Sequence, residues 1–294
     1  MKAFYLKLFF IFFISLAFCN EDEKYTFIFG GSQRLEVGEK WTYKVSHELE
    51  FNIPDIGFIK YSTENISISE YLGIEGEFAK FKETLTDMKS DNYVNKIEIM
   101  DYYREAMENN PCYLYIKGPG SGAFWGEVVY IEPTKEEYDY LQEAYEAAYM
   151  NIYPVNYRYP FSSRGVNVAV GDKWILDYHK SKFYVNMGSP PSQSLSKTAW
   201  TLKKVKEKRR GKIAVIEMQD SLILELQVAV EFLGERRLMT GQATGVSDVT
   251  YNWDIDSGEL LKTYAITNLY GDFEMDDEKF TMKIFMRDIS KQVK

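Results

Sequence analysis

The chain has 294 residues, of which 45% are hydrophobic and 16% aromatic, enough to bury the core of one large or two moderate domains. Its 23 Tyr and 19 Phe, against only 8 Pro, favour ordered β-sheet over disorder. The formal net charge of −9 argues against nucleic acid as a partner, because that binding rests on the neutralisation of phosphates. It also gives the chain no general attraction to an anionic membrane.

Residues 1–19 predict a secretory signal peptide. Two lysines precede the apolar run 8–18, and Ala17 and Cys19 stand at the −3 and −1 positions of a cleavage site. The run is shorter than the roughly 20 residues of a membrane-spanning helix. We therefore expect an exported protein that is periplasmic, outer-membrane-associated or secreted. Cys19 has a second interpretation as a lipidation site, since bacterial lipoproteins carry a lipid on a Cys that ends such a run. Either way Cys112 is left without an intrachain disulfide partner.

A short motif occurs twice. Val37-Gly38-Glu39-Lys40-Trp41 returns as Val170-Gly171-Asp172-Lys173-Trp174, and GEFAKFKE at 76–83 is paralleled by GKIAVIEM at 211–218. Gly allows a sharp turn, and Trp then opens a strand with a large buried ring. The sequence thus predicts two related β-rich units, a first repeat at 20–152 and a second repeat at 168–294, joined by a Pro-containing connector at 153–167.

Alternating apolar residues predict further strands, and short turns between them predict antiparallel pairing. The strands are expected at 61–71, 112–116, 124–131, 198–205, 213–218, 222–233, 249–255, 260–269 and 280–289. The segment 254–260 has the composition of a hairpin turn, with acidic residues, Ser and then Gly. A helix is expected at 135–152, capped by Thr134 and apolar on one side, and a weaker helix at 96–108. The fold class is therefore mainly β (α+β): two antiparallel halves with a helix near the end of the first.

The two motifs, the connector before the second and the D-x-x-S-G-E-L hairpin at 254–260 resemble a family of exported bacterial proteins of unknown function. The resemblance covers most of the chain after residue 19 and implies an envelope location and a duplicated β-rich fold. It supplies no catalytic residues. A looser similarity, at the level of fold analogy only, is to open half-barrel lipoprotein carriers that shelter acyl chains.

Two sets of residues are candidate binding sites. Strand-opening aromatic residues are predicted to be structural, with a ligand platform as the functional alternative: Trp41, Trp174, Trp125 and Phe124. The last two follow a Gly-rich loop at 118–122, which is either a flexible loop or a lid over a pocket. A basic run is predicted to be a solvated hairpin tip, with an anionic partner such as lipid headgroups or lipopolysaccharide as the alternative. It comprises Lys203, Lys204, Lys206, Lys208, Arg209, Arg210 and Lys212.

Known catalytic motifs are absent from the sequence: it has no H-E-x-x-H, C-x-x-C, Walker loop or G-x-S-x-G. We therefore nominate no catalytic residue, cofactor or metal. His47 and His179 could meet and bind a metal, but no acidic residue or Cys lies at a sequence spacing typical of metal ligands. Asp248, Asp254 and Asp256 are interpreted as turn residues, since their spacing lacks a full calcium-loop pattern.

Three functional hypotheses follow. The first is a non-enzymatic envelope protein that binds or carries an apolar ligand such as lipid. The second is a structural or protein-interaction module of the envelope that takes no small ligand. The third is a carbohydrate hydrolase, because a β protein with 44 acidic residues offers many carboxylate pairs. The oligomeric state is left open.

Overall fold

The computed structural model of the chain describes residues 24–27, 36–54, 56–94, 97–98, 107–108, 110–117, 127–133, 166–183, 190, 192–209, 211–232 and 235–293. Every named element in this part of the chain is a strand, and Met107 is the one described residue in a helical conformation. In the same residues no helix has the length and apolar character needed to cross a membrane. The predicted β-rich class is therefore confirmed.

The strands are β1 (Lys24–Phe27), β2 (Lys40–Ile53), β3 (Gly57–Glu75), β4 (Phe78–Ser90), β5 (Tyr93–Val94), β6 (Ile97–Glu98), β7 (Cys112–Lys117), β8 (Glu127–Pro133), β9 (Val166–Ala169), β10 (Lys173–Phe183), β11 (Ser192–Lys208), β12 (Gly211–Phe232), β13 (Glu235–Asp254), β14 (Leu260–Met275) and β15 (Glu278–Gln292). β1 and β9 form a two-stranded sheet, and the other strands form one 13-stranded sheet.

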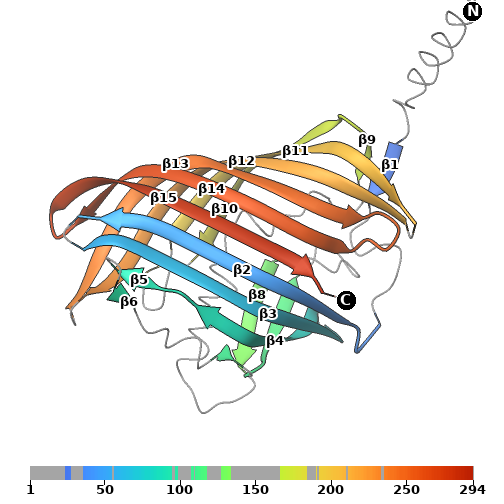
Figure 1. The fold of residues 1–294 in the computed structure, drawn as a ribbon, viewed down its shortest axis with the longest axis horizontal. Helices are drawn as coiled ribbons and strands as arrows, with labels where there is room; N and C mark the ends of the chain where they lie inside the picture. Colours follow the sequence, from blue (N-terminus) through green and yellow to red (C-terminus); the bar gives the residue numbers. More distant parts are fainter. Residues whose placement is uncertain are drawn as a thin grey trace, which may run out of the picture.

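The large sheet is antiparallel and has the order β10-β11-β12-β13-β14-β15-β2-β3-β4-β7-β8, with β5 and β6 beside β3. Its two halves meet where the last long strand, β15, pairs with the first, β2. The sheet curls, and β10 and β8 at its two ends both lie behind the front strands β15 and β2 (Figure 1). Among the described residues the sheet is not closed, because β10 and β8 each pair with one neighbouring strand.

Side chains alternate between the two faces of the sheet, as the pleat of a strand requires. On β2 the odd-numbered residues from Trp41 to Ile53 are mostly apolar, and the even-numbered ones from Lys40 to Asn52 are polar or charged. The odd-numbered side belongs to the inner face of the sheet, where the core lies. The largest fully buried side chains of this core include Trp200, Trp253 and Tyr251.

Small residues occupy the inner face where β13 and β14 cross the middle of the sheet. Gly241, Ala243 and Gly245 alternate along β13, and Gly271 lies opposite Ala243 on β14. A Cβ added at Gly245 would lie 2.9 Å from the Cα of Leu269, and closer still to the carbonyl oxygen of Asn268. The absence of a side chain therefore lets the two backbones approach each other as the sheet curls.

The repeated motif forms the same turn at both places. Gly38 and Gly171 have φ of 91° and 95°, in the left-handed region. The N–H of Gly38 donates to the carbonyl of Tyr71 at 2.8 Å, and the N–H of Gly171 donates to the carbonyl of Leu202, also at 2.8 Å. Each turn thus ties the start of one strand, β2 or β10, to the strand beside it, β3 or β11.

Several predicted boundaries need correction. The segment 96–108 was expected to be a helix, but Ile97–Glu98 form strand β6 against β5, and most of the rest lies outside the described residues. The strands expected at 213–218 and 222–233 are one strand, β12, of 22 residues. β9 begins at Val166, inside the end of the expected connector. The helix expected at 135–152, the signal peptide and Cys19 all lie outside the described residues.

The hairpin predicted at 254–260 is present between β13 and β14. Gly258 has φ of 72°, and its N–H donates to the carbonyl of Asp254 at 2.9 Å. The Asp254 carboxylate accepts the N–H groups of Asp256 and Ser257, each at 3.0 Å. Asp254 is therefore a turn-forming residue, as the sequence indicates, whereas Asp248, also interpreted as a turn residue, lies inside β13 opposite Ile266.

Candidate functional site: a polar patch on the inner face

Polar residues interrupt the apolar inner face where β15, β2, β3 and β4 run side by side. We call this group the polar patch; it comprises Tyr43, Asn65, Ser67, Ser69, Glu83 and Gln292. Register places Gln292 opposite Tyr43, Tyr43 opposite Ser67, and Ser69 opposite Glu83. Since residues directly opposite each other in a ladder share a face, all six lie on the side of the sheet that carries Trp41.

Glu83 is the acidic centre of the patch. It is 2% exposed, and its two carboxylate oxygens accept hydrogen bonds from the hydroxyls of Ser67 and Ser69, one each. Such charge-assisted hydrogen bonds offset part of the cost of burying a carboxylate. Cys112, on β7, lies opposite Glu83, and burial together with the nearby Glu83 charge raises the pKa of its thiol. A thiol held protonated in this way is a poor nucleophile.

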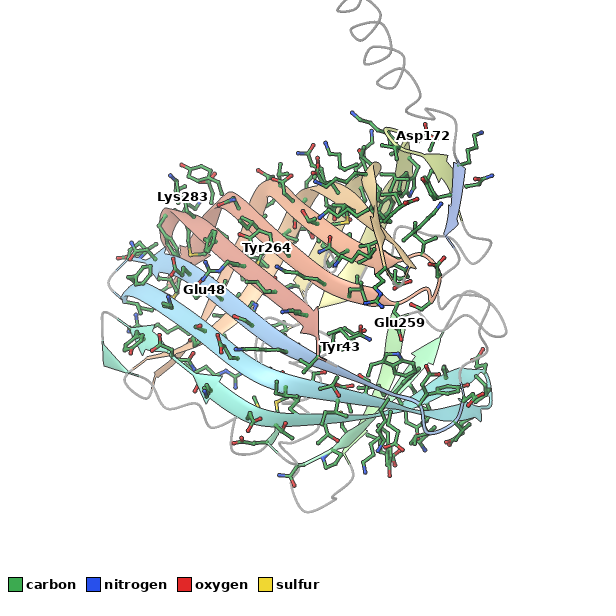
Figure 2. All side chains as sticks on the ribbon, turned by 45° about the vertical axis from the view of Figure 1, so that its right-hand side comes forward. Tyr43, Glu48, Asp172, Glu259, Tyr264 and Lys283 are labelled. Carbon is green, nitrogen blue, oxygen red and sulfur yellow. The ribbon has the colours of Figure 1, made fainter. Side chains whose placement is uncertain are left out.

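Tyr43 lies near Glu83 and is partly buried. Its hydroxyl donates to the carbonyl of Leu260 at 3.2 Å. Burial, then the negative charges of Glu259 and Glu83, raise the pKa of Tyr43, so its phenol stays protonated. Figure 2 shows Tyr43 and Glu259 close together near the end of β15. The electrostatic potential at this end of the inner face is therefore negative.

Two amide side chains of the patch have oxygens that are buried but unpaired. Asn65 Oδ1 and Gln292 Oε1 have no hydrogen-bond partner within the part of the chain that the structure describes. A buried polar atom left without a hydrogen bond costs about 1–3 kcal/mol of folding free energy. Two such atoms lie close together on the inner face. A ligand that donates hydrogen bonds to them would remove this cost.

Polarity along β3 is inverted at this place. In Asn65-Ile66-Ser67-Ile68-Ser69 the polar residues point inward, and register places Ile66 and Ile68 opposite Lys44 and Thr42 on the outer face. An ordinary half-buried strand would have the isoleucines inside. The inversion moves hydroxyl and amide groups into the core at the expense of apolar burial.

His47 extends the polar surface further along β2. Its Nδ1 lies 2.5 Å from Oδ1 of Asp288 on β15, and the two side chains are 24% and 17% exposed. The sequence left open a meeting of His47 with His179, but the observed contact of His47 is with Asp288, and His179 lies opposite Ser196 on β11. The described residues contain no group of three or more His, Cys, Asp or Glu that could hold a metal ion.

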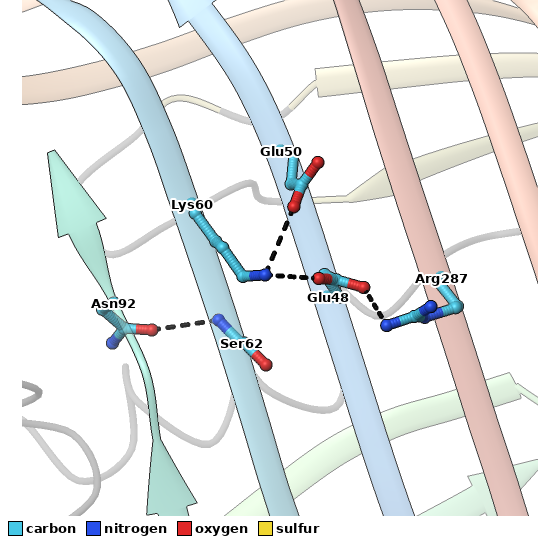
Figure 3. Close-up of polar contacts among 6 residues, drawn as sticks. All are labelled: Glu48, Glu50, Lys60, Ser62, Asn92 and Arg287. Carbon is cyan, nitrogen blue, oxygen red and sulfur yellow. Dashed lines mark hydrogen bonds and ion pairs between the residues drawn. The ribbon is translucent and has the colours of Figure 1, made fainter. Parts of the chain in front are cut away.

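The outer face next to the patch is charged. Glu48 of β2 forms ion pairs with Lys60 of β3, at 2.6 Å between Oε1 and Nζ, and with Arg287 of β15; Lys60 also reaches Glu50 at 3.3 Å (Figure 3). The hydrogen bond from Lys60 is the main cause that lowers the pKa of Glu48. This network joins three adjacent strands on the side facing water.

The aromatic residues predicted as a ligand platform are not grouped at one place in the sheet order. Trp41 is 8% exposed and opposite Ser69, so it borders the polar patch. Trp174, on β10, stacks on Trp200 at 6.3 Å between ring centroids. Phe124 and Trp125 lie outside the described residues. A ligand role for these four residues stays a prediction.

The basic run forms the tip of the β11–β12 hairpin. Lys204, Lys206, Lys208 and Arg209 are exposed, Lys203 pairs with Glu217 at 2.9 Å, and Arg210 lies outside the described residues. The acidic turn of β13–β14 lies against its base, because Asp256 accepts the N–H of Lys212 at 3.1 Å. Asp256 and Asp254 thus lower the net charge of the tip that an anionic partner would meet.

The sequence alone does not single out the polar patch beyond Trp41 at its border. The one available signal was the Asn-x-Ser-x-Ser alternation at 65–69, and only strand register shows which side of it is buried. Gln292 joins the patch through β15–β2 pairing, between residues at opposite ends of the chain.

No protein-family model matches the sequence, and no similar curated protein was found. Among solved structures, the chain is similar to OmpF of Salmonella typhi in its complex with daunomycin, with 7% identity, 87% of this chain and 97% of that chain covered, and a TM-score of 0.23. A likeness at this TM-score carries no argument about fold or function, so both rest on the contacts of this chain.

Proposed function

We propose that the protein is an exported, non-enzymatic binding protein of the cell envelope, and that the inner face of its sheet holds an apolar ligand, such as a lipid, that bears a polar group. The observation that carries this proposal is the pair of buried, unpaired oxygens of Asn65 and Gln292 on the inner face. An apolar body would contact the core residues, and its polar group would satisfy these atoms. Export rests on the predicted signal peptide at 1–19.

Four further observations support a binding role. The Cys112 thiol is held protonated, and the Glu83 carboxylate is occupied by two serine hydroxyls. The outer face next to the patch carries ion pairs, so the hydrogen-bonding groups without partners lie on the inside. Tyr61, an inner-face residue opposite Leu49, is 38% exposed, so the inner face reaches solvent at this point.

Native mass spectrometry of the protein, purified gently from its envelope fraction, tests this function. We expect an extra mass that organic solvent removes and that lipid analysis identifies as an apolar molecule. A matched variant, Asn65→Leu with Gln292→Met, should retain less of that mass than wild type, because it lacks both amide oxygens. A bare chain from the envelope fraction that also fails to take up added amphiphiles would overturn the proposal. A stoichiometric protein companion in place of the small mass would favour the interaction-module hypothesis.

A further inference from the structure

The buried atoms of the polar patch that lack a hydrogen bond are both acceptors. Ser67 and Ser69 donate their hydroxyl hydrogens to Glu83, so each serine oxygen has only lone pairs to offer a ligand. Asn65 and Gln292 present their buried carbonyl oxygens. The one hydroxyl donor beside them, that of Tyr43, is directed to the carbonyl of Leu260. A ligand group that pairs with these unpaired oxygens must therefore supply the hydrogens itself.

The charges around the patch have one sign. Glu83 lies at its centre, and burial, followed by the charges of Glu259 and Glu83, raises the pKa of Tyr43. The nearest lysines on β2, Lys40 and Lys44, lie on the outer face, where they pair with Glu70 and Glu64. An anionic group would be repelled by Glu83 and would find donors only in the side-chain NH2 groups of Asn65 and Gln292, whereas a cation would be attracted and would be only weakly screened in this buried setting.

We infer that the polar patch binds the ammonium group of an amphiphile, and that the amphiphile's apolar part lies on the core residues of the inner face. An ammonium group supplies three N–H donors and one positive charge, which matches the acceptors of Asn65, Gln292 and the serines and the charge of Glu83. This inference rests on the proposed binding function and adds the chemical class of the head group. Neither the composition nor the resemblance indicated a cationic ligand.

The test compares three ligands with the same twelve-carbon chain: dodecylammonium, dodecanol and dodecanoate. Each is titrated below its micelle concentration at pH 7, and binding is followed by tryptophan fluorescence, since Trp41 borders the patch, and by calorimetry. We expect dodecylammonium to bind at least about tenfold more tightly than dodecanol, which corresponds to about 1.4 kcal/mol. Dodecanoate should bind most weakly, because its carboxylate faces Glu83.

The decisive variant is Glu83→Gln, which keeps an oxygen for the serine hydroxyls and removes the charge. Its matched control is Glu64→Gln, an acidic residue of the neighbouring strand β3 that points to the outer face and pairs with Lys44. Glu83→Gln should reduce dodecylammonium affinity about tenfold and leave dodecanol affinity unchanged, while Glu64→Gln should change neither. If Glu83→Gln does not fold, which urea unfolding would reveal, Asn65→Leu serves as the second variant and should weaken the ammonium ligand selectively.

The outcomes separate the head group from the function itself. Equal affinities for all three ligands, or equal effects of Glu83→Gln and Glu64→Gln, would overturn the ammonium inference and leave the binding function standing. Failure of all three ligands to bind would refute the binding function, and the ammonium inference with it.

Discussion

Gly245→Ala should destabilise the protein strongly, although Ala is ordinarily more stabilising than Gly in the interior of a strand. The added Cβ would lie 2.9 Å from the Cα of Leu269, whereas carbon atoms in contact lie about 3.5–4.0 Å apart. β13 and β14 would therefore have to separate by about 0.6–1 Å at this point. Overpacking of this kind costs about 1–3 kcal/mol, and weakening of two adjacent ladder hydrogen bonds adds about 1 kcal/mol each.

The opposing gain is small. Replacing Gly by Ala in a strand interior gains about 0.5–1 kcal/mol, so the net loss should be about 2–4 kcal/mol, a large fraction of the about 5–15 kcal/mol that stabilises a typical protein. Urea unfolding followed by tryptophan fluorescence measures it, since Trp200 and Trp253 are buried in the same core. The control is Thr244→Ala, the exposed neighbour on the outer face, which should lose less than about 1 kcal/mol. If Gly245→Ala is as stable as the wild type, the idea that Gly245 is needed for the close approach of β13 and β14 is refuted.

Three further predictions concern stability and reactivity. The hydrogen bond from Lys60 holds the pKa of Glu48 below its ordinary value of 4.5, so the pairing stabilises the fold above that value and is lost as the pH falls through the lowered pKa. As the pH is lowered below 4.5, the urea midpoint of Glu48→Gln should therefore fall less steeply than that of the wild type. Trp253→Ala should cost about 3–5 kcal/mol, because the side chain is 1% exposed, and a large drop in melting temperature would report it. Cys112 should resist a thiol reagent at pH 8 in the native protein and react at once in urea; rapid native labelling would contradict its burial.

The sequence by itself determined the local parts of this fold. Alternation of apolar and polar residues specifies the strands, and it succeeds because the pleat exposes alternate side chains to different surroundings. Gly38 and Gly171 mark the two equivalent turns, and Asp254 and Gly258 mark the late hairpin, because their conformations depend on a few neighbouring residues only. The boundaries of 96–108 and of β12 were predicted wrongly, since pairing with neighbouring strands decides where a strand begins and ends.

Only the tertiary structure decided which residues form the polar patch. Alternation shows that Asn65, Ser67 and Ser69 share one face of β3, but it does not say whether that face is inside, and a shift of register by one residue would reverse the answer. Register against β2 puts them inside and Ile66 outside. The pairing of β15 with β2 then brings Gln292 to Tyr43 from the far end of the chain. Such long-range pairing cannot be predicted from the sequence pattern. The alternation within a strand shows which residues share a face, but it does not show which other strand pairs with it.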